Sequence, residues 1–321
     1  MDSSKLYLVA LPVFMLAIAI EGLLYQRVLH RPYSWGVTGS NLVVAIGRLV
    51  SDLGTKALMV AVYLAAYELR PFDIPMDRWE SWVALFFALE IAYYWLHRFS
   101  HEIRWMWAQH SVHHSAQQIT LSVAYRLGWT QFVAGPWLFL IPVCWLGFDP
   151  RAVMLTYAAS LLYQFWLHTE AVGKLGFLER FMNTPSHHRV HHAVEPEYLD
   201  RNYGGVLIIW DKLFGTFAPE RDGAPITYGL VRQIDTLNPV KIAFAEWVAM
   251  ARDVRSARTL GEAFGYMFRA PGWKPDGSGM TTRALRQAAG IPEDTRSPTV
   301  MEQGLPDSSA GVAKAAAPLR A

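Results

Sequence analysis

The sequence predicts an all-α, polytopic membrane protein with about four or five transmembrane helices and a cytosolic helical cap. Hydrophobic residues make up 52% of the 321 residues and charged residues only 17%, against about 25% in ordinary soluble domains. Long apolar runs alternate with polar segments, and many tryptophans and tyrosines lie near the ends of these runs, as at membrane–water interfaces. The net charge of +2, without a basic block, argues against a nucleic-acid partner.

Five apolar runs account for the predicted membrane helices. They cover residues 6–25, 41–67, 79–96, 131–148 and 152–167. Each is about long enough to cross a hydrocarbon core roughly 30 Å thick. The first run has neither a strongly basic segment before it nor a small-residue cleavage site after it, so we expect an uncleaved transmembrane helix. The fourth and fifth runs meet at Pro150 like a helical hairpin, and Pro136 and Pro142 would only kink the fourth.

The distribution of lysine and arginine predicts an orientation in the membrane. The segments at 97–130 and after 168 carry most basic residues and are expected in the cytoplasm, whereas 68–78 is expected outside. The predicted divisions are three membrane helices in 1–96, a histidine-rich catalytic region in 97–217, an interfacial extension in 218–274 and a disordered tail in 275–321.

Two features inside the apolar runs carry polar or reactive groups. Arg48, Asp52 and Lys56 share a helix face, and form either an interfacial ion-pair ladder or a polar stripe that lines a cavity. The single cysteine, Cys144, excludes an intramolecular disulfide and a cysteine-built metal site. Its place in an apolar run predicts a small buried hydrophobic residue.

Ten of the eleven histidines lie between residues 97 and 192, at spacings that place them on shared helix faces. Three boxes have this spacing: His97 and His101; His110, His113 and His114; and His188, His191 and His192. His187 and His191 are also four apart, so the choice between His187 and His188 stays open. Thr184 and Pro185 predict a helix start before the third box. His168 ends the fifth run, with Gln164 one turn earlier on the same face.

So many imidazoles at repeated helical spacing predict a metal centre. Packed together without a metal, they would leave buried polar nitrogens unpaired. Eight or nine histidines exceed what one ion can bind, so two ions are the economical number. Imidazole suits zinc, copper, iron and nickel about equally, and the spacing alone does not choose among them.

The three boxes, in the order H-x-x-x-H, H-x-x-H-H, H-x-x-H-H after membrane helices, resemble those of the fatty acid hydroxylase and sterol desaturase superfamily. Residues 92–217 carry this resemblance. The strings at 163–170, 183–192 and 202–217, with Tyr228, Gly229 and Leu230, are similar to the alkylglycerol monooxygenase branch of that superfamily.

The resemblance implies a non-haem di-iron oxygenase. The implied iron ligands are His97, His101, His110, His113, His114, His188, His191 and His192, completed by His168. Gln164 stands where some relatives have a further histidine, and could bind iron through water or support a ligand. Glu102 and Glu170 lie close to ligands in the sequence and could hydrogen-bond an imidazole. His187 and Asn202 are expected to support the site.

The implied reaction is hydroxylation of a lipid C–H bond with O2, including cleavage of ether lipids after hydroxylation beside the ether oxygen. The alternative within this enzyme class is a hydroxylase or desaturase of sterols, carotenoids or fatty-acyl lipids. The branch implies tetrahydrobiopterin as the electron donor, and the broader superfamily implies an external electron-transfer protein. The sequence contains no glycine-rich dinucleotide fingerprint.

Three other classes fit less well. A divalent metal transporter would need ligands near the centres of the membrane helices, whereas these histidines lie at helix ends and beyond. A metalloprotease would need H-E-x-x-H, but Trp105 stands where the second histidine after His101 and Glu102 belongs. An inactive scaffold would not need all the box histidines.

Overall fold

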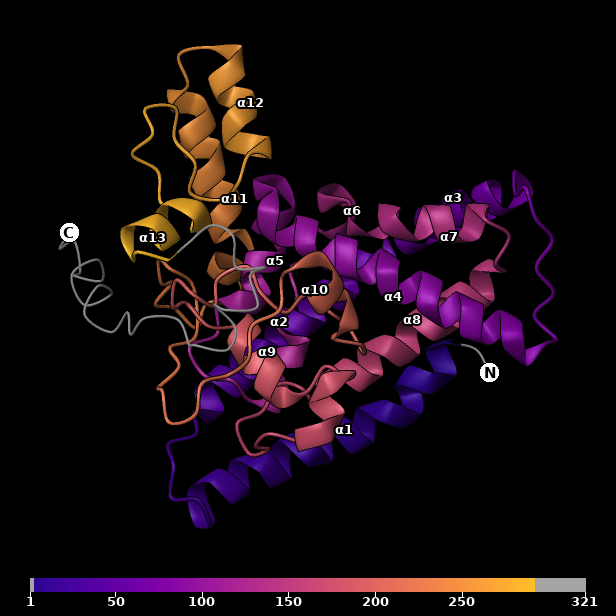
Figure 1. Cartoon of the computed structure of the whole chain (residues 1–321), viewed down its shortest axis with the longest axis horizontal. Coiled ribbons are helices and arrows are strands. Elements are labelled where there is room, and N and C mark those ends of the chain that lie inside the picture. Colours follow the sequence, from indigo (N-terminus) through magenta and orange to yellow (C-terminus); the bar gives the residue numbers. More distant parts are fainter. Residues whose placement is uncertain (1–2, 292–321) are drawn as a thin grey trace.

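The computed structural model describes residues 3–291, and within them only two isolated backbone bridges interrupt an all-helical chain (Figure 1). The all-α prediction is therefore confirmed. The α-helices are α1 (Ser3–Arg27), α2 (Trp35–Leu53), α3 (Lys56–Glu68), α4 (Trp79–Glu102), α5 (Arg104–His114), α6 (Gln131–Ala134), α7 (Ile141–Trp145), α8 (Pro150–Phe165), α9 (Pro185–His191), α10 (Ile209–Phe214), α11 (Pro239–Ser256), α12 (Leu260–Phe268) and α13 (Thr282–Ala288). Short 3-10 helices cover η1 (Leu121–Tyr125), η2 (Pro136–Leu140) and η3 (Gly176–Arg180).

Helices α3, α4, α7 and α8 form an elongated arm (Figure 1). Apolar side chains from all four helices fill its core. They include Met59, Tyr63, Leu85, Leu89, Val143, Cys144 and Val153. Cys144 is fully buried there, as the sequence predicts. Helix α1 runs along α8, where the Phe14 ring stacks on Phe165 with the ring centroids 3.8 Å apart.

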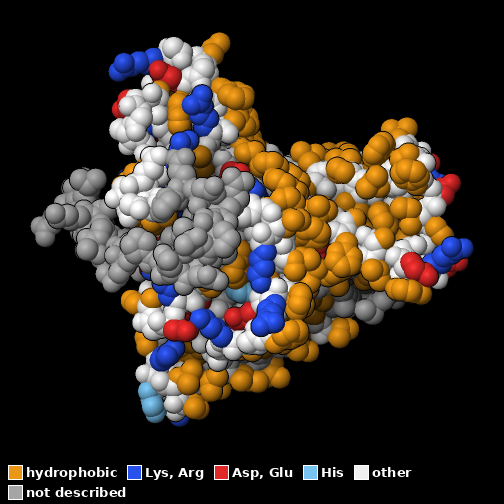
Figure 2. All heavy atoms as spheres, in the orientation of Figure 1, with side chains coloured by type: hydrophobic (Ala, Val, Ile, Leu, Met, Phe, Trp, Pro, Cys, Tyr) orange, Lys and Arg blue, Asp and Glu red, His pale blue; other side chains and the backbone are white. Residues whose placement is uncertain are grey.

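The outer surface of the arm and of α1 is apolar (Figure 2). Exposed positions there include Leu16, Leu58, Leu64 and Phe87. An exposed apolar surface of this extent is typical of a membrane or protein interface. In the described chain, the segment Val9–Arg27 is long and apolar enough to cross a membrane by itself, and α2 with α3 would make a second crossing if the bent pair is one span. The count of four or five spans stays a prediction.

Two of the predicted continuous runs are broken in the structure. The run at 41–67 is divided into α2 and α3, which meet at a 55° bend after Gly54. The run at 131–148 is divided into α6, η2 and α7. Gly135 adopts a left-handed conformation with φ of +88°, and Pro136 lacks the N–H that would continue a helix. Only the fourth run was expected to kink, at its prolines, and the bend in the run at 41–67 was not expected.

The predicted ion-pair ladder is present in part. Arg48 Nε lies 2.7 Å from Asp52 Oδ2 within α2. Arg48 also donates to the carbonyl of Gly128, 3.0 Å away, and contacts Gln131. Lys56 lies beyond the bend, at the start of α3, and lines a small cavity with Gln131. The stripe therefore ties α2 to the segment before α6.

The remaining helices gather around one end of the arm (Figure 1). There α5, α9 and α10 form the cap that carries most of the histidines, and the pair α11 and α12 projects away from it. Helix α13 lies inside the predicted disordered tail, so that prediction does not hold for residues 282–288. The rest of the tail, from residue 292, lies outside the described residues.

Candidate metal centre

The first histidine box lies at the end of a long helix. Helix α4 extends to Glu102, so the division predicted after residue 96 falls inside it. His97 and His101 therefore project from its last two turns, on one face. Ile103 then takes an extended conformation, with φ of −112° and ψ of 116°, and α5 begins at the next residue. This corner brings the second box against the first.

The third box begins with the predicted helix start. The Thr184 side chain accepts a hydrogen bond from the backbone N–H of His187, and Pro185 occupies the first turn of α9. His192 directly follows the helix as its C-cap. His168 approaches from the turn that follows α8, so the centre draws on four helix ends.

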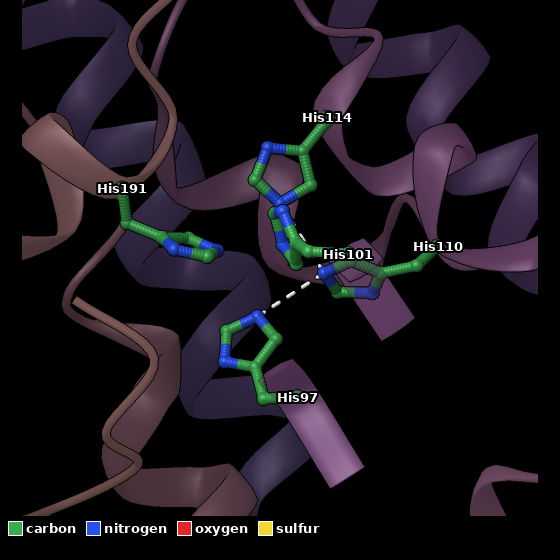
Figure 3. A group of neighbouring side chains, drawn as sticks. All are labelled: His97, His101, His110, His114 and His191. Atoms are coloured by element: carbon green, nitrogen blue, oxygen red, sulfur yellow. Dashed lines mark hydrogen bonds between the residues drawn. The ribbon is translucent and has the colours of Figure 1, made fainter. Parts of the chain in front are cut away.

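All nine histidines predicted as ligands gather in two groups. The first group contains His97, His101, His110, His114 and His191, and the second contains His113, His168, His188 and His192. Within each group, the candidate ligand atoms, one from each ring, all lie within 4.8 Å of one another. Figure 3 shows the five rings of the first group turned toward a common centre. All nine are buried except His110, which is partly buried.

The two groups adjoin because sequence neighbours divide between them. His113 belongs to the second group and His114 to the first, and His192 and His191 are divided in the same way. The rings of His114 and His192 stack with their centroids 4.3 Å apart. Two groups of five and four imidazoles agree with the economical number of two ions.

Hydrogen bonds to the outer nitrogens fix how several rings present their inner ones. Nδ1 of His97 donates to the carbonyl of Tyr203 at 2.8 Å, Nδ1 of His191 to Arg201 at 2.9 Å, and Nδ1 of His168 to Gln164 at 3.0 Å. A neutral imidazole that donates from Nδ1 has its lone pair on Nε2. Nε2 of these three rings is therefore ready to bind a metal.

The spacing of the inner nitrogens fits coordination. Five Nε2–Nε2 separations lie between 2.9 and 3.2 Å: His97–His110, His110–His114, His113–His168, His168–His188 and His188–His192. Two imidazole nitrogens at this distance either share one N–H proton or, when both present lone pairs, repel unless a cation lies between them. Metal–nitrogen bonds of about 2.1 Å at right angles would separate the nitrogens by about 3.0 Å, and a tetrahedral site by about 3.4 Å. In the described residues, Nε2 of His101 and of His191 has no hydrogen-bond partner.

Burial favours the neutral form of the histidines considered next, and metal binding requires that form. Burial lowers the pKa of His168 to about 4, although hydrogen bonds to the carbonyls of Gln164 and Phe165 partly oppose the shift. The pKa of the box histidines after α4 falls well below its usual range, because burial and neighbouring histidines disfavour the charged form.

A turn at residues 200–203 supports three ligands of the first group. Besides the Arg201 and Tyr203 carbonyls, the Asp200 carboxylate lies 3.4 Å from Nδ1 of His101. Asp200 and Asn202 have left-handed φ values of +55° and +57°, which are uncommon outside glycine but best tolerated by these residue types. Asn202 stabilises the turn through hydrogen bonds from its side-chain amide to the carbonyls of His187 and Ala218.

The structure separates His187 from His188. His188 belongs to the second group, whereas the His187 ring packs against Phe217 with the ring centroids 5.4 Å apart. The His187 carbonyl accepts a hydrogen bond from the Asn202 side chain, so the two residues expected to support the site are bonded to each other.

Of the other three candidate residues, Gln164 supports a ligand, which is one of the two roles expected for it, whereas Glu102 and Glu170 have other partners. Gln164 supports His168 through its backbone carbonyl, while its side chain accepts from the Tyr93 hydroxyl at 2.7 Å. In the described part of the chain, Glu102 pairs with Arg98 at 2.8 Å rather than with a histidine. Glu170 accepts a hydrogen bond from Tyr228 and donates through its backbone N–H to Tyr25.

Sequence reasoning missed two buried acids that hold the site together. Both Asp211 oxygens accept hydrogen bonds, from the backbone N–H groups of Tyr203 and Gly204, each at 2.7 Å. Glu90, two turns before His97 on α4, accepts from the N–H groups of Val206 and Leu207. Glu90 could have been identified from the sequence, because a carboxylate inside an apolar run such as the third is unusual and often functional.

Comparison with known proteins agrees with this geometry. The family described as Fatty acid hydroxylase matches residues 82–216, which contain every histidine of the two groups. The chain therefore carries a fatty acid hydroxylase domain, and the family predicted from the three boxes is confirmed. Enzymes of this family are membrane-bound, in agreement with the apolar surface of the arm.

Two alkylglycerol monooxygenases are similar to the chain. The Homo sapiens protein is 38% identical over 221 residues, which cover 68% of this chain and 49% of that protein. The Xenopus tropicalis protein is 33% identical over 273 residues, covering 85% and 58%. A Rhizobium tropici ornithine lipid hydroxylase is 29% identical over 144 residues, covering 44% of each. The chain spans about half the length of the alkylglycerol monooxygenases that it matches. No solved structure matches it.

Proposed function

We propose that the protein is a membrane-bound monooxygenase that hydroxylates a lipid C–H bond with O2 at two iron ions. The observation that carries the proposal is the convergence of nine imidazoles in two adjoining groups. The relatives named above support lipid oxidation as the activity. The five imidazoles of the first group exceed the four ligands of a structural zinc site, which supports iron over structural zinc.

The nine histidines would hold the iron, and the iron would supply O2 activation and removal of a hydrogen atom from the substrate. One oxygen atom enters the C–H bond and the other leaves as water, so two electrons and two protons are consumed. We propose tetrahydrobiopterin or an external electron-transfer protein as the donor. The chain itself contributes neutral ligands, their hydrogen-bonded orientation, and a buried site from which bulk water is excluded.

We propose an ether lipid as the substrate, because the Homo sapiens and Xenopus tropicalis relatives are named alkylglycerol monooxygenases. Hydroxylation beside the ether oxygen gives a hemiacetal that collapses to an aldehyde and an alcohol. The ornithine lipid hydroxylase favours a second candidate, hydroxylation of an acyl lipid. Sterol, carotenoid and fatty-acyl hydroxylation or desaturation complete the alternatives.

We propose a multi-pass protein with its metal centre facing the cytoplasm. The centre lies at one end of the arm, which suits a substrate whose apolar part stays in the bilayer while the reacting carbon reaches the iron. Of the supporting residues, Gln164 orients His168 through its carbonyl, and Asn202 orients the 200–203 turn. We propose that Glu102 and Glu170 contribute to the electrostatic environment of the centre and do not hydrogen-bond a ligand.

Metal analysis of two neighbouring variants tests the assignment. The full chain, purified in detergent, should contain about two irons per chain, as expected for one ion in each of the two groups. His188→Ala should lose much of this iron, whereas His187→Ala, changed at the adjacent buried residue, should retain it. Equal retention in both variants, with both proteins eluting as folded monodisperse species, would contradict the ligand assignment.

Product analysis then separates the substrates. The iron-loaded protein, with tetrahydrobiopterin or a reducing electron-transfer system, is incubated with an alkylglycerol, an ornithine lipid and a sterol. Release of a fatty aldehyde from the alkylglycerol would support ether cleavage. A hydroxylated acyl lipid without aldehyde would favour the second candidate, and no product from any lipid would contradict the enzymatic function.

A further inference from the structure

Helices α11 and α12 form a hairpin that projects beside the arm (Figure 1). Each helix has its own N-cap: the Asn238 side chain accepts from two backbone N–H groups of α11, and Thr259 accepts from one of α12. The hairpin is thus a well-formed element rather than an extension of the loops. Its position outside the helical core leaves one side without a protein partner in the described chain.

That side carries a stripe of large apolar residues on each helix. The spacing is four residues in both: Val240, Phe244 and Val248 on α11, and Leu260, Phe264 and Phe268 on α12. Residues four apart share a helix face. Leu260 is 91% exposed and Phe264 60% exposed. Two such stripes would be unfavourable in water and are typical of a surface that contacts another apolar phase.

The two stripes join each other and the surface of the arm. Trp105 packs against Trp247 of α11 and stacks on Phe268 of α12, and its indole N–H donates to the carbonyl of Val133. Val133 is itself 57% exposed at α6. Figure 2 shows hydrophobic side chains continuing along the edge of the hairpin onto the arm. The stripes therefore extend the apolar surface that belongs to the membrane part.

The charges of the hairpin complement a lipid surface. Residues 239–269 contain five basic and three acidic side chains. Two of the acids, Glu246 and Asp253, are already paired with the buried Arg104, each at 2.7 Å. Arg252 and Arg255 follow Val248 at helical spacing and are exposed. Arginines beside an apolar stripe suit the phosphates of a bilayer surface.

We propose that the α11–α12 hairpin lies in the interface of the bilayer, with Phe264 and Leu260 among the acyl chains near the headgroups. The partner is the lipid surface itself, because the stripes are continuous with the apolar arm and are bordered by arginine. The hairpin is also tied to the metal centre: Arg104 begins α5, and its backbone N–H donates to the carbonyl of Arg269. Contact with the bilayer thereby sets the height of the second histidine box above the membrane.

Site-specific labelling of the full chain in vesicles tests this. In a Cys144→Ala background, an environment-sensitive fluorophore is attached at Phe264→Cys or, independently, at the highly exposed Leu260→Cys. The matched control is Ser278→Cys, in the segment that packs on the opposite side of α12 through Trp273 and Gly265. The vesicles contain phosphatidylcholine and phosphatidylglycerol, with a quencher either in water, as iodide, or on the acyl chain, as a doxyl-labelled lipid.

The expected result is strong doxyl quenching and several-fold weaker iodide quenching at 260 and 264, with the reverse at 278. Iodide quenching as strong at 260 and 264 as at 278 would overturn the proposal. Shielding from iodide without doxyl quenching would also overturn it, because a protein partner or a second copy would then cover the stripe. The two labelled positions are largely exposed, so neither substitution disturbs the packed interior.

Discussion

At the scale of single residues, the metal centre depends on side chains that touch no candidate ligand atom. The carbonyls of the 200–203 turn orient the His97 and His191 imidazoles. Hydrogen bonds from Asn202 and to Asp211 stabilise this turn. Hydrogen bonds from residues that do not bind the metal commonly set the orientation and basicity of a metal-binding histidine. Asp211 is the clearest case, because burial raises its pKa to about 6 while two backbone N–H groups and the Thr216 hydroxyl donate to it.

Asp211→Asn is expected to weaken the centre without removing a ligand. The new amide would direct an N–H group at a backbone N–H donor of the turn, and an unsatisfied buried group of this kind costs about 1–3 kcal/mol. Thermal unfolding and iron content of the purified variant give the measurement, and both should fall. Asp222→Asn is the control, since Asp222 is 90% exposed and pairs with Lys174 at the surface. Unchanged iron retention in Asp211→Asn would contradict a positioning role.

At the scale of elements, helix ends decide where the ligands lie. The ends of α4, α5 and α9 and the turn after α8 each bring histidines to the two groups. Helix α9 is the most sensitive of them, because it has only seven residues and little helical stability of its own.

Removing the N-cap of α9 is expected to impair metal retention. Thr184→Ala removes the acceptor for the His187 N–H, at a cost of about 1 kcal/mol. Ser34→Ala removes the corresponding cap of α2, a helix that supplies no histidine to either group, and should leave the iron content unchanged. Iron measured after dialysis against a weak chelator distinguishes the two variants. A loss in Thr184→Ala no larger than in Ser34→Ala would show that the cap does not support the third box.

The sequence predicted the site better than the scaffold that holds it. Histidines at i, i+3 and i+4 define their own geometry once the helix exists, so the three boxes could be located from their spacing. The ninth residue, His168, and the choice of His188 over His187 came from the family resemblance. The 200–203 turn could not, because its contacts with His97 and His101 join parts of the chain about 100 residues apart. The break at Gly135 was also missed, since hydropathy does not reveal a left-handed residue inside an apolar run.

At the scale of the whole molecule, a metal centre stands at one end of an apolar arm. The predicted orientation places that end in the cytoplasm and the 68–78 segment on the other side of the membrane. The orientation follows from lysine and arginine counts. The centre lies at one end of the long axis of the arm (Figure 1), and the 68–78 segment is expected on the opposite side of the membrane.

Accessibility in intact cells tests that orientation. In the Cys144→Ala background, Asp73→Cys should react with a membrane-impermeant maleimide added outside, because Asp73 is 86% exposed in the segment expected outside. Asp222→Cys, on the side of the centre, should react only after permeabilisation. The reverse pattern would invert the proposed topology, and reaction of both from outside would exclude a centre that faces the cytoplasm.

The division of neighbouring histidines between the two groups has a consequence for how iron is acquired. Because α5 supplies His113 to one group and His114 to the other, and His191 and His192 are shared out in the same way, an ion in one group also orders the backbone that presents ligands to the other. Filling should therefore be positively cooperative. Under limiting iron, the protein would consist mainly of empty and doubly loaded molecules, with few that hold a single ion.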